Sequence, residues 1–146
     1  TPIDLVKIVS DVVNEVQTVY PQKIISNLPE QLLFPIKPTD FRNIAHNLVE
    51  NAAKYSPADS EINVVLKKQA DKLLFQVADH GIGISQENRE KIFERFYRED
   101  KSHSSKVGGS GLGLAIVKAE VDKYHGQITV EDNTPQGTIF SVYLPK

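Results

Sequence analysis

The chain has 146 residues, 40% of them hydrophobic and 25% charged, a balance that fits one domain with a single ordinary core. It has no cysteine and a formal net charge of −2, which excludes disulfides and thiolate metal sites and argues against a nucleic-acid partner, because binding phosphates requires a basic face. The longest stretch without a polar side chain, residues 111–117, is far shorter than the roughly 20 residues of a transmembrane helix, so we expect no direct membrane insertion. The absence of cysteine suits a reducing compartment, so we expect a cytoplasmic location.

The first part of the chain predicts a helix followed by short extended segments. Across residues 4–19 the apolar residues recur at helical spacing, and Pro21 closes the segment. Residues 23–28 and 31–36 are short apolar stretches separated by Pro29. These two stretches predict a strand pair, or a strand and a turn.

A second helix is predicted after them. Thr39 or Asp40 can cap its N-terminus, and it extends to about Tyr55, where Ser56-Pro57 ends it. Its apolar residues recur every three to four positions, so one side should face the core. That buried side is predicted to consist of Phe41, Ile44, Leu48 and Ala52.

Two strands and an irregular segment come next. Residues 61–68 and 72–79 alternate between apolar and polar side chains and predict two strands joined by a polar turn. Residues 87–96 predict a short helical stretch. Residues 98–110 are polar, rich in serine and glycine and without periodicity, which is typical of a mobile loop.

The last part of the chain predicts a third long helix over residues 111–124 and two strands, 127–131 and 138–144, joined by a turn. The residues expected to point inward from this helix are Leu112, Ala115, Ile116, Ala119 and Val121. Helices and antiparallel hairpins in this order predict an α+β fold: a two-layer α/β sandwich with helices on one face of a mixed sheet. A doubly wound parallel fold would require strict strand–helix alternation, which the sequence lacks.

The outward side of the second helix carries an unusual set of polar residues. Asn47 and Asn51 are four residues apart, as are Glu50 and Lys54, so all four side chains project from one side of the helix. Asparagine is a mediocre helix former, so two copies facing one way predict a use for their amide oxygens, and such oxygens are suitable ligands for Mg²⁺. A solvated face with one Glu50–Lys54 pair is the alternative.

A second candidate site lies at the end of the strand over residues 72–79. Asp79 continues the alternation of Leu73, Phe75 and Val77, so its carboxylate should enter the core side of the sheet. A carboxylate placed there needs donors, and the exocyclic amine of adenine is one. Glycines at 81 and 83 would let a flat ring approach the backbone closely, although Asp-X-Gly is also a common turn.

A third candidate site is the glycine-rich stretch over residues 108–114 that opens the third helix. A glycine turn feeding a helix presents unpaired backbone N–H groups and the positive end of the helix dipole, which together suit a phosphate. The spacing fits neither G-x-G-x-x-G nor a Walker loop, because no strand precedes it and no Lys-Ser or Lys-Thr follows the glycines. Glycines that only make a loop flexible are the alternative.

Taken together, these motifs resemble the ATP-binding catalytic domain of bacterial sensor histidine kinases, part of the superfamily of gyrase, heat-shock chaperone and mismatch-repair ATPases. Residues 47–57 look like the asparagine box of that family, 79–83 like its first glycine box, 92–98 like its phenylalanine box and 109–114 like its second glycine box. Gly137-Thr138 looks like the small third glycine box. The resemblance covers residues 1–146 as one domain and implies a Bergerat-type fold, with about five mostly antiparallel strands, three long helices on one face and a mobile ATP lid over about residues 93–111.

The resemblance also implies roles for individual residues, with ATP and Mg²⁺ as cofactors. Asn51 would ligate Mg²⁺, Asn47 would support the metal and phosphates, Lys54 would contact phosphate, and Tyr55 would pack on the adenine. Asp79 would accept a hydrogen bond from the adenine amine, and Arg98, with Arg95, would reach the γ-phosphate during transfer. Arg98 as an ordinary surface cation is the alternative. Further nucleotide contacts would come from Gly81, Gly83, Ile84, Thr138, Gly109, Gly111, Leu112, Gly113 and Leu114.

The same resemblance predicts phosphoryl transfer instead of hydrolysis. Hydrolysing relatives carry a glutamate four residues before the metal-binding asparagine, and this chain has Asn47 there, an amide that cannot act as a base. Glu50 is a candidate for assisting a proton transfer. None of the four histidines precedes an acidic residue on a helix as the accepting histidine of a sensor kinase does.

The expected partners are therefore ATP and ADP, the dimerisation and histidine-phosphotransfer helices of the same parent protein, and indirectly a response regulator. The parent is expected to be a homodimer anchored in the cell membrane. A serine kinase or slow ATPase of the same superfamily, or a pseudokinase that uses the fold only to bind a partner, are the alternative functions.

Overall fold

The computed structural model describes residues 1–85, 87, 89, 91–93 and 113–146 of the chain, and the description below concerns these residues. Their elements, in chain order, are β1 (Ile3–Asp4), α1 (Leu5–Val19), β2 (Lys23–Asn27), β3 (Leu33–Phe34), α2 (Pro38–Tyr55), β4 (Glu61–Gln69), β5 (Lys72–Ala78), the 3₁₀ turn η2 (Lys91–Phe93), α4 (Gly113–Lys123), β6 (Gln127–Asp132) and β7 (Thr138–Pro145). No helix among these residues is long and apolar enough to cross a bilayer.

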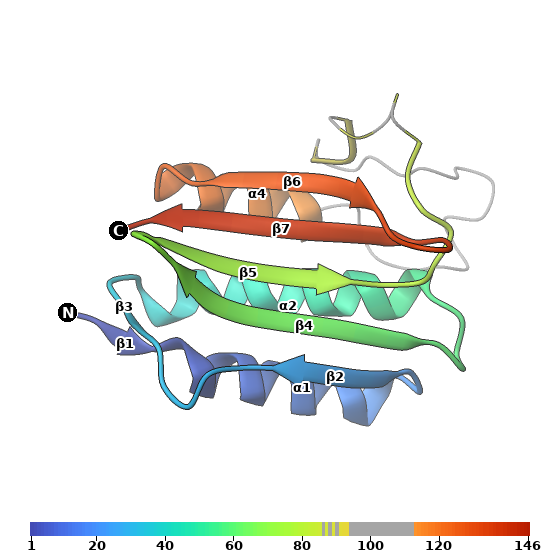
Figure 1. Cartoon of the computed structure of the whole chain (residues 1–146), viewed down its shortest axis with the longest axis horizontal. Coiled ribbons are helices and arrows are strands. Elements are labelled where there is room, and N and C mark those ends of the chain that lie inside the picture. Colours follow the sequence, from blue (N-terminus) through green and yellow to red (C-terminus); the bar gives the residue numbers. More distant parts are fainter. Residues whose placement is uncertain (86, 88, 90, 94–112) are drawn as a thin grey trace.

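The described strands form a five-stranded sheet in the order β2-β4-β5-β7-β6. β2 runs parallel to β4, and the other neighbours are antiparallel. The helices α1, α2 and α4 lie together against one face of this sheet (Figure 1). The predicted α+β sandwich, with a mixed and mostly antiparallel sheet and three long helices on one face, is confirmed.

The core lies between these two layers. The inward positions of the central strands alternate and are buried: Ile62, Val64, Leu66, Leu73, Phe75, Val77, Phe140, Val142 and Leu144. They meet the predicted buried side of α2, from which Phe41 packs edge-to-face on Phe75 with ring centroids 5.6 Å apart. The side of α2 opposite its buried stripe is thus left free for polar residues.

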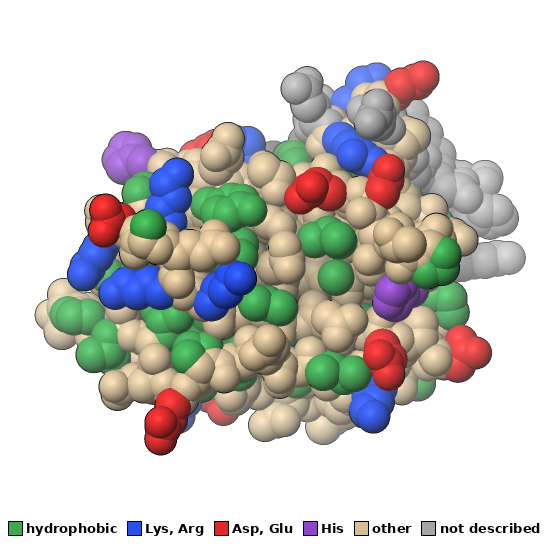
Figure 2. Space-filling model, in the orientation of Figure 1, with side chains coloured by type: hydrophobic (Ala, Val, Ile, Leu, Met, Phe, Trp, Pro, Cys, Tyr) green, Lys and Arg blue, Asp and Glu red, His purple; other side chains and the backbone are tan. Residues whose placement is uncertain are grey.

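The other face of the sheet carries no helix in the described part of the chain. Basic, apolar and uncharged polar side chains are interspersed over it (Figure 2). Leu74 and Ser141 are nevertheless buried there by their neighbours, and Gln76 donates to the Ser141 hydroxyl at 2.9 Å. The helical face is therefore where the apolar core and the candidate site lie.

The N-terminal region differs from the sequence prediction in its pairing. Residues 23–28 and 31–36 do not form a strand pair with each other. β2 joins the main sheet beside β4, and β3 pairs with β1 in a separate two-stranded sheet with Ile3 opposite Phe34. Asp4 ends β1 and caps α1, because its carboxylate accepts from the backbone N–H of Val6 at 3.1 Å.

The start of α2 also differs from the prediction, because neither Thr39 nor Asp40 is the cap. The helix begins at Pro38, and Lys37, two residues before Thr39, occupies the cap position without a side-chain hydrogen bond. Proline fits the first helical position because its fixed φ suits a helix and its missing N–H would have no partner there. The carbonyl of Lys37 accepts instead from the backbone N–H groups of Asp40 and Phe41, each at 3.1 Å.

The inward face of α4 was predicted correctly at Val121 and wrongly at Ile116 and Ala119. Val121 is buried as expected, but Val117 is the other buried residue of α4, Ile116 is 39% exposed and Ala119 is exposed. Apolar side chains occur on almost every side of this helix, so the spacing did not fix which side faces the core. The helical stretch predicted over 87–96 is represented by the short turn η2 at residues 91–93. Its last residues, 94–96, lie outside the described residues. The same holds for the predicted lid after residue 93 and for the start of the predicted third helix, including Leu112.

Candidate functional site

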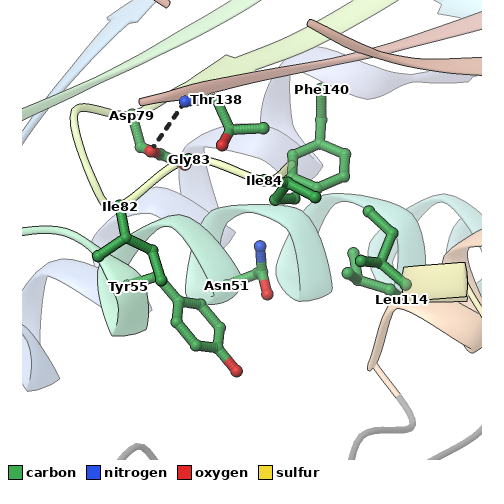
Figure 3. Close-up of a pocket in the computed structure, with 10 residues that line it drawn as sticks. Asn51, Tyr55, Asp79, Ile82, Gly83, Ile84, Leu114, Thr138 and Phe140 are labelled. Carbon is green, nitrogen blue, oxygen red and sulfur yellow. Dashed lines mark hydrogen bonds between the residues drawn. The ribbon is translucent and has the colours of Figure 1, made fainter. Parts of the chain in front are cut away.

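A pocket opens where the end of β5, the start of β7, the second half of α2 and the start of α4 meet. Asn51 and Tyr55 come from α2, and Asp79, Gly83 and Ile84 come from the loop that follows β5 (Figure 3). The full set of lining residues is Asn51, Tyr55, Asp79, Ile82, Gly83, Ile84, Ile92, Leu114, Thr138 and Phe140. Segments far apart in the sequence thus supply one cavity.

Asp79 is the charged group of this pocket, and it is 4% exposed. Its Oδ1 atom accepts from the backbone N–H of Gly81 at 2.9 Å and from that of Thr138 at 3.2 Å. Its Oδ2 atom has no hydrogen-bond partner among the described residues, which leaves one carboxylate oxygen for a donor on a ligand. Burial raises the pKa of Asp79 above its ordinary value, and the two backbone N–H groups and the charge of His80 act in the opposite direction.

Glycines let the loop after β5 lie directly on its neighbours. A Cβ at Gly81 would collide with the backbone carbonyl of Tyr55, so this residue can pass the last turn of α2 only as glycine. Gly137 has φ +126°, and a Cβ added there would likewise collide with the backbone carbonyl of Asp79. The loop is therefore packed between α2 and the β6–β7 turn, and Asp79 faces the pocket from a defined position.

The remaining walls of the pocket are mostly apolar. Ile82, Ile84 and Leu114 contribute aliphatic side chains, and Phe140 is further fixed by an edge-to-face contact with Phe93 at 6.4 Å between ring centroids. A slot with apolar walls and one buried acceptor suits a flat ring that carries a hydrogen-bond donor on its edge. Such a ligand would bury both faces of its ring and at the same time donate a hydrogen bond to the carboxylate of Asp79.

The polar side of α2 borders the pocket. Lys54 Nζ lies 3.6 Å from Glu50 Oε1, in a pair whose side chains are 23% and 31% exposed, so the ion pair that belonged to the alternative interpretation of this side of the helix is present. Asn47 donates from Nδ2 to the carbonyl of Asn43 at 2.7 Å, which leaves its Oδ1 as an acceptor. The amide of Asn51 has no hydrogen-bond partner within the described ranges.

The start of α4 approaches the same polar side. An added Cβ at Gly113 would lie 3.1 Å from Asn47 Oδ1, so the first turn of α4 passes directly over Asn47. The positive end of a helix dipole thus lies beside the amide oxygen of Asn47. No group of three or more His, Cys, Asp or Glu side chains among the described residues could hold a metal ion. A divalent cation here would need ligand oxygens of its own, such as phosphates, in addition to an amide.

The structure brings most of the predicted site residues together. Asn51, Tyr55, Asp79, Gly83, Ile84, Leu114 and Thr138 line the pocket. Gly81 contacts Asp79, and Gly113 contacts Asn47, one helical turn from Asn51. Glu50 and Lys54 pair with each other on the same side of α2 and do not line the pocket. Arg95, Arg98, Gly109, Gly111 and Leu112 lie outside the described residues, so their roles stay predictions.

Three lining residues were missed by the sequence reasoning: Ile82, Ile92 and Phe140. A signal for Phe140 was available, because it follows Thr138 by two positions and therefore shares its face of β7. Ile82 is 63% exposed and lies between two glycines, where no periodicity marks it as a wall of the pocket.

Comparisons with known proteins agree with this geometry. Residues 36–146 match the family described as histidine kinase-, DNA gyrase B-, and HSP90-like ATPase. The chain is 48% identical to the sensor protein CiaH of Streptococcus pneumoniae over 97 residues, which are 66% of this chain and 22% of CiaH. It is 34% identical to the sensor histidine kinase WalK of Bacillus subtilis over 148 residues, which are 98% of this chain and 24% of WalK. The chain thus spans about a quarter of the length of these relatives.

Solved structures show the same fold along the whole chain. The mycobacterial sensor histidine kinase MprB superposes with a TM-score of 0.90 at 28% identity, covering 99% of this chain and 97% of that one. Full-length ShkA, whose crystal structure contains AMPPNP, superposes with a TM-score of 0.81 at 24% identity over 99% of this chain and 30% of ShkA, a likeness of fold alone.

Proposed function

The chain belongs to the family of histidine kinase-, DNA gyrase B- and HSP90-like ATPases, among relatives named as sensor histidine kinases, and we propose that it binds Mg-ATP and supplies the γ-phosphoryl group to a histidine on a separate dimerisation helix. The observation that carries this proposal is the buried Asp79 carboxylate, which lines a pocket with mostly apolar walls and keeps one oxygen without a partner among the described residues. The asparagines of α2 border the same slot.

Base recognition rests on Asp79 and the walls around it. Oδ1 is occupied by two backbone N–H groups, so the carboxylate is held in one orientation, and Oδ2 accepts from the exocyclic amine of adenine. The purine faces are covered by aliphatic side chains, including Ile84 and Leu114. Guanine carries a carbonyl oxygen at the position of the adenine amine, which would face a carboxylate oxygen, so the site favours adenine.

Phosphate and metal binding rest on the polar side of α2 and the start of α4. When bound, Mg²⁺ would neutralise phosphate charge during transfer. Asn51 supplies an amide oxygen to that ion, Asn47 supports it, and Lys54 contacts a phosphate at the end of its ion pair with Glu50. The N-terminus of α4 faces the phosphates with its positive end. Gly109, Gly111, Leu112, Arg95 and Arg98 are proposed to complete this half of the site.

Transfer to a histidine is favoured over hydrolysis by the residue at position 47. The Asn47 amide donates to a backbone carbonyl and cannot take a proton from water, so no base for water attack stands there. The accepting histidine is proposed to lie on the dimerisation and phosphotransfer helices of the parent protein, from which a response regulator receives the phosphoryl group. The parent is proposed to be a membrane-anchored homodimer whose catalytic domain is cytoplasmic.

A phosphotransfer assay tests this proposal. The chain is incubated with γ-labelled ATP, Mg²⁺ and the dimerisation helices of its parent, and acid-labile label on those helices is measured. We expect label on the helices and none on the chain itself. Asn51→Ala should abolish the labelling, and Asp71→Asn, an exposed turn residue, should leave it unchanged. Steady release of inorganic phosphate without labelled helices would instead show an ATPase, and acid-labile label on the isolated chain would contradict transfer to a separate helix.

A further inference from the structure

Arg89 joins the end of the loop over residues 79–84 to the edge of the sheet. Its Nε and Nη2 atoms both donate to the carbonyl of Ile84 at 3.3 Å, and Nη1 donates to the carbonyl of Val130 in β6 at 3.3 Å. Nη2 also pairs with Asp132 Oδ1 at 2.5 Å. The Arg89 side chain is 20% exposed, whereas that of Asp132 is 75% exposed, so the two carbonyl contacts are the sheltered part of this arrangement.

These contacts hold the loop at the end opposite Asp79. At the start of the loop, Asn133 Nδ2 donates to the carbonyl of Asp79 at 2.7 Å and the N–H of Thr138 donates to its side chain. At the far end, the carbonyl of Ile84 is held by Arg89. Both anchors belong to, or reach, the β6–β7 hairpin, so the hairpin serves as a rigid frame for the loop.

We propose that Arg89 is a positioning residue for the nucleotide: by fixing the Ile84 carbonyl to β6, it keeps the Ile84 side chain against the purine and sets the distance between that wall and Asp79. The proposal rests on adenine nucleotide binding as proposed above. Arg89 itself does not line the pocket, so it acts through Ile84. Only a guanidinium can reach two carbonyls and a carboxylate at once, because its donors form a planar fork.

A purely structural role for Arg89 would have a different signature. It would lower the unfolding temperature but leave the affinity of the folded protein for nucleotide unchanged. A positioning role changes affinity on the base side of the pocket, so ATP, ADP and AMP must be weakened by the same factor, and the preference for ATP over GTP must narrow. The nucleotide series and the ratio of the two bases therefore separate the two roles.

Equilibrium titration and stopped-flow release of a ribose-labelled fluorescent ATP analogue test the proposal on the folded chain. We expect Arg89→Ala to raise the Kd of all three adenine nucleotides about fivefold to tenfold, mainly through faster release. Asp132→Asn removes only the exposed partner and should stay close to wild type. Arg42→Ala is the matched control, because Arg42 pairs with Glu15 between α2 and α1 and does not line the pocket.

Arg89→Lys keeps the test decisive if the alanine variant does not fold. Lysine preserves the positive charge opposite Asp132 but cannot donate hydrogen bonds to both carbonyls, so the Kd values of the Arg89→Lys variant should rise. Methylguanidinium added to a folded Arg89→Ala variant should restore its affinity for nucleotide. If the wild type binds ATP and both variants bind it equally well, the positioning role is overturned while the proposed function stands. If the wild type binds no adenine nucleotide, both are overturned.

Discussion

Asp79→Asn should change nucleotide affinity and the stability of the free protein in opposite directions. Asparagine has the shape of aspartate, and its amide oxygen can still accept from Gly81 and Thr138, so the loop should keep its conformation. Its NH₂ group would then stand in the place of Oδ2, the atom proposed to accept from adenine, and the proposed charge-assisted hydrogen bond would be lost. We expect ATP and ADP to weaken alike by about 10- to 150-fold, which corresponds to about 1.5–3 kcal/mol.

The stability of the free protein should rise at neutral pH. Because burial raises the pKa of Asp79, the folded chain binds a proton more tightly than the unfolded chain at this residue. The free energy of unfolding that Asp79 contributes therefore falls as the pH rises from the ordinary pKa of aspartate through the raised pKa of Asp79. Above the raised pKa the full cost of burying the charged carboxylate is reached. A neutral amide carries no such penalty, so Asp79→Asn should unfold at a higher temperature than wild type near pH 7 and lose this advantage in acid.

Calorimetric titration and thermal unfolding across a pH series measure both effects. Asp71→Asn, in the exposed turn between β4 and β5, removes the same charge away from the pocket and should change neither quantity appreciably. The affinity of wild type for ATP should fall as the pH is lowered through the raised pKa of Asp79, and that of the variant should not follow. An Asp79→Asn protein that binds ATP as tightly as wild type would refute the assignment of adenine to this carboxylate.

Three other substitutions follow from the same geometry. Gly81→Ala places a methyl group against the carbonyl of Tyr55, so the free energy of unfolding should fall by about 1–3 kcal/mol and ATP binding should weaken. Unchanged thermal stability would contradict the close packing of the loop on α2. Tyr124→Phe removes the hydrogen bond that, more than Lys123, lowers the pKa of Asp40. The free energy of unfolding should fall by about 1 kcal/mol at pH values above the ordinary pKa of aspartate, and by less as the pH drops through the lowered pKa of Asp40. Equal unfolding free energies of the variant and wild type across a pH series would show that this hydrogen bond does not stabilise the fold. Asn47→Glu installs a carboxylate base at the proposed phosphate site and should raise steady ATP hydrolysis by about tenfold or more. A phosphate-release assay without any gain would argue against a site geometry shared with the hydrolysing relatives.

Local periodicity predicted the parts of the fold in which a single pattern decides. The apolar stripe of α2 has one possible inner side, and Phe41, Ile44, Leu48 and Ala52 are all buried. Alternation in β5 placed Asp79 on the inner face, where it is found. That residues far apart in the sequence, such as Asn51 and Asp79, lie in one site was predicted from the resemblance to a family and not from the spacing of residues.

Other features depend on contacts that spacing does not specify. In α4 apolar residues surround the axis, and only packing against α2 and the sheet selects Val117 over Ile116 as the buried residue. The pairing of β3 with β1 joins segments about 30 residues apart that are each two residues long, too short to show a pattern. Arg89 belongs to the same class, since its importance comes from two carbonyls that lie in another strand and an earlier loop.

Isothermal calorimetry of the folded wild-type chain with ATP and ADP, in the presence and absence of Mg²⁺, tests the central claim most directly. We predict saturable binding of both nucleotides at one site per chain, tighter ATP binding with Mg²⁺ than without it, and a smaller effect of the metal in Asn51→Ala. No binding of any adenine nucleotide to well-folded protein, with or without the divalent cation, would contradict the account.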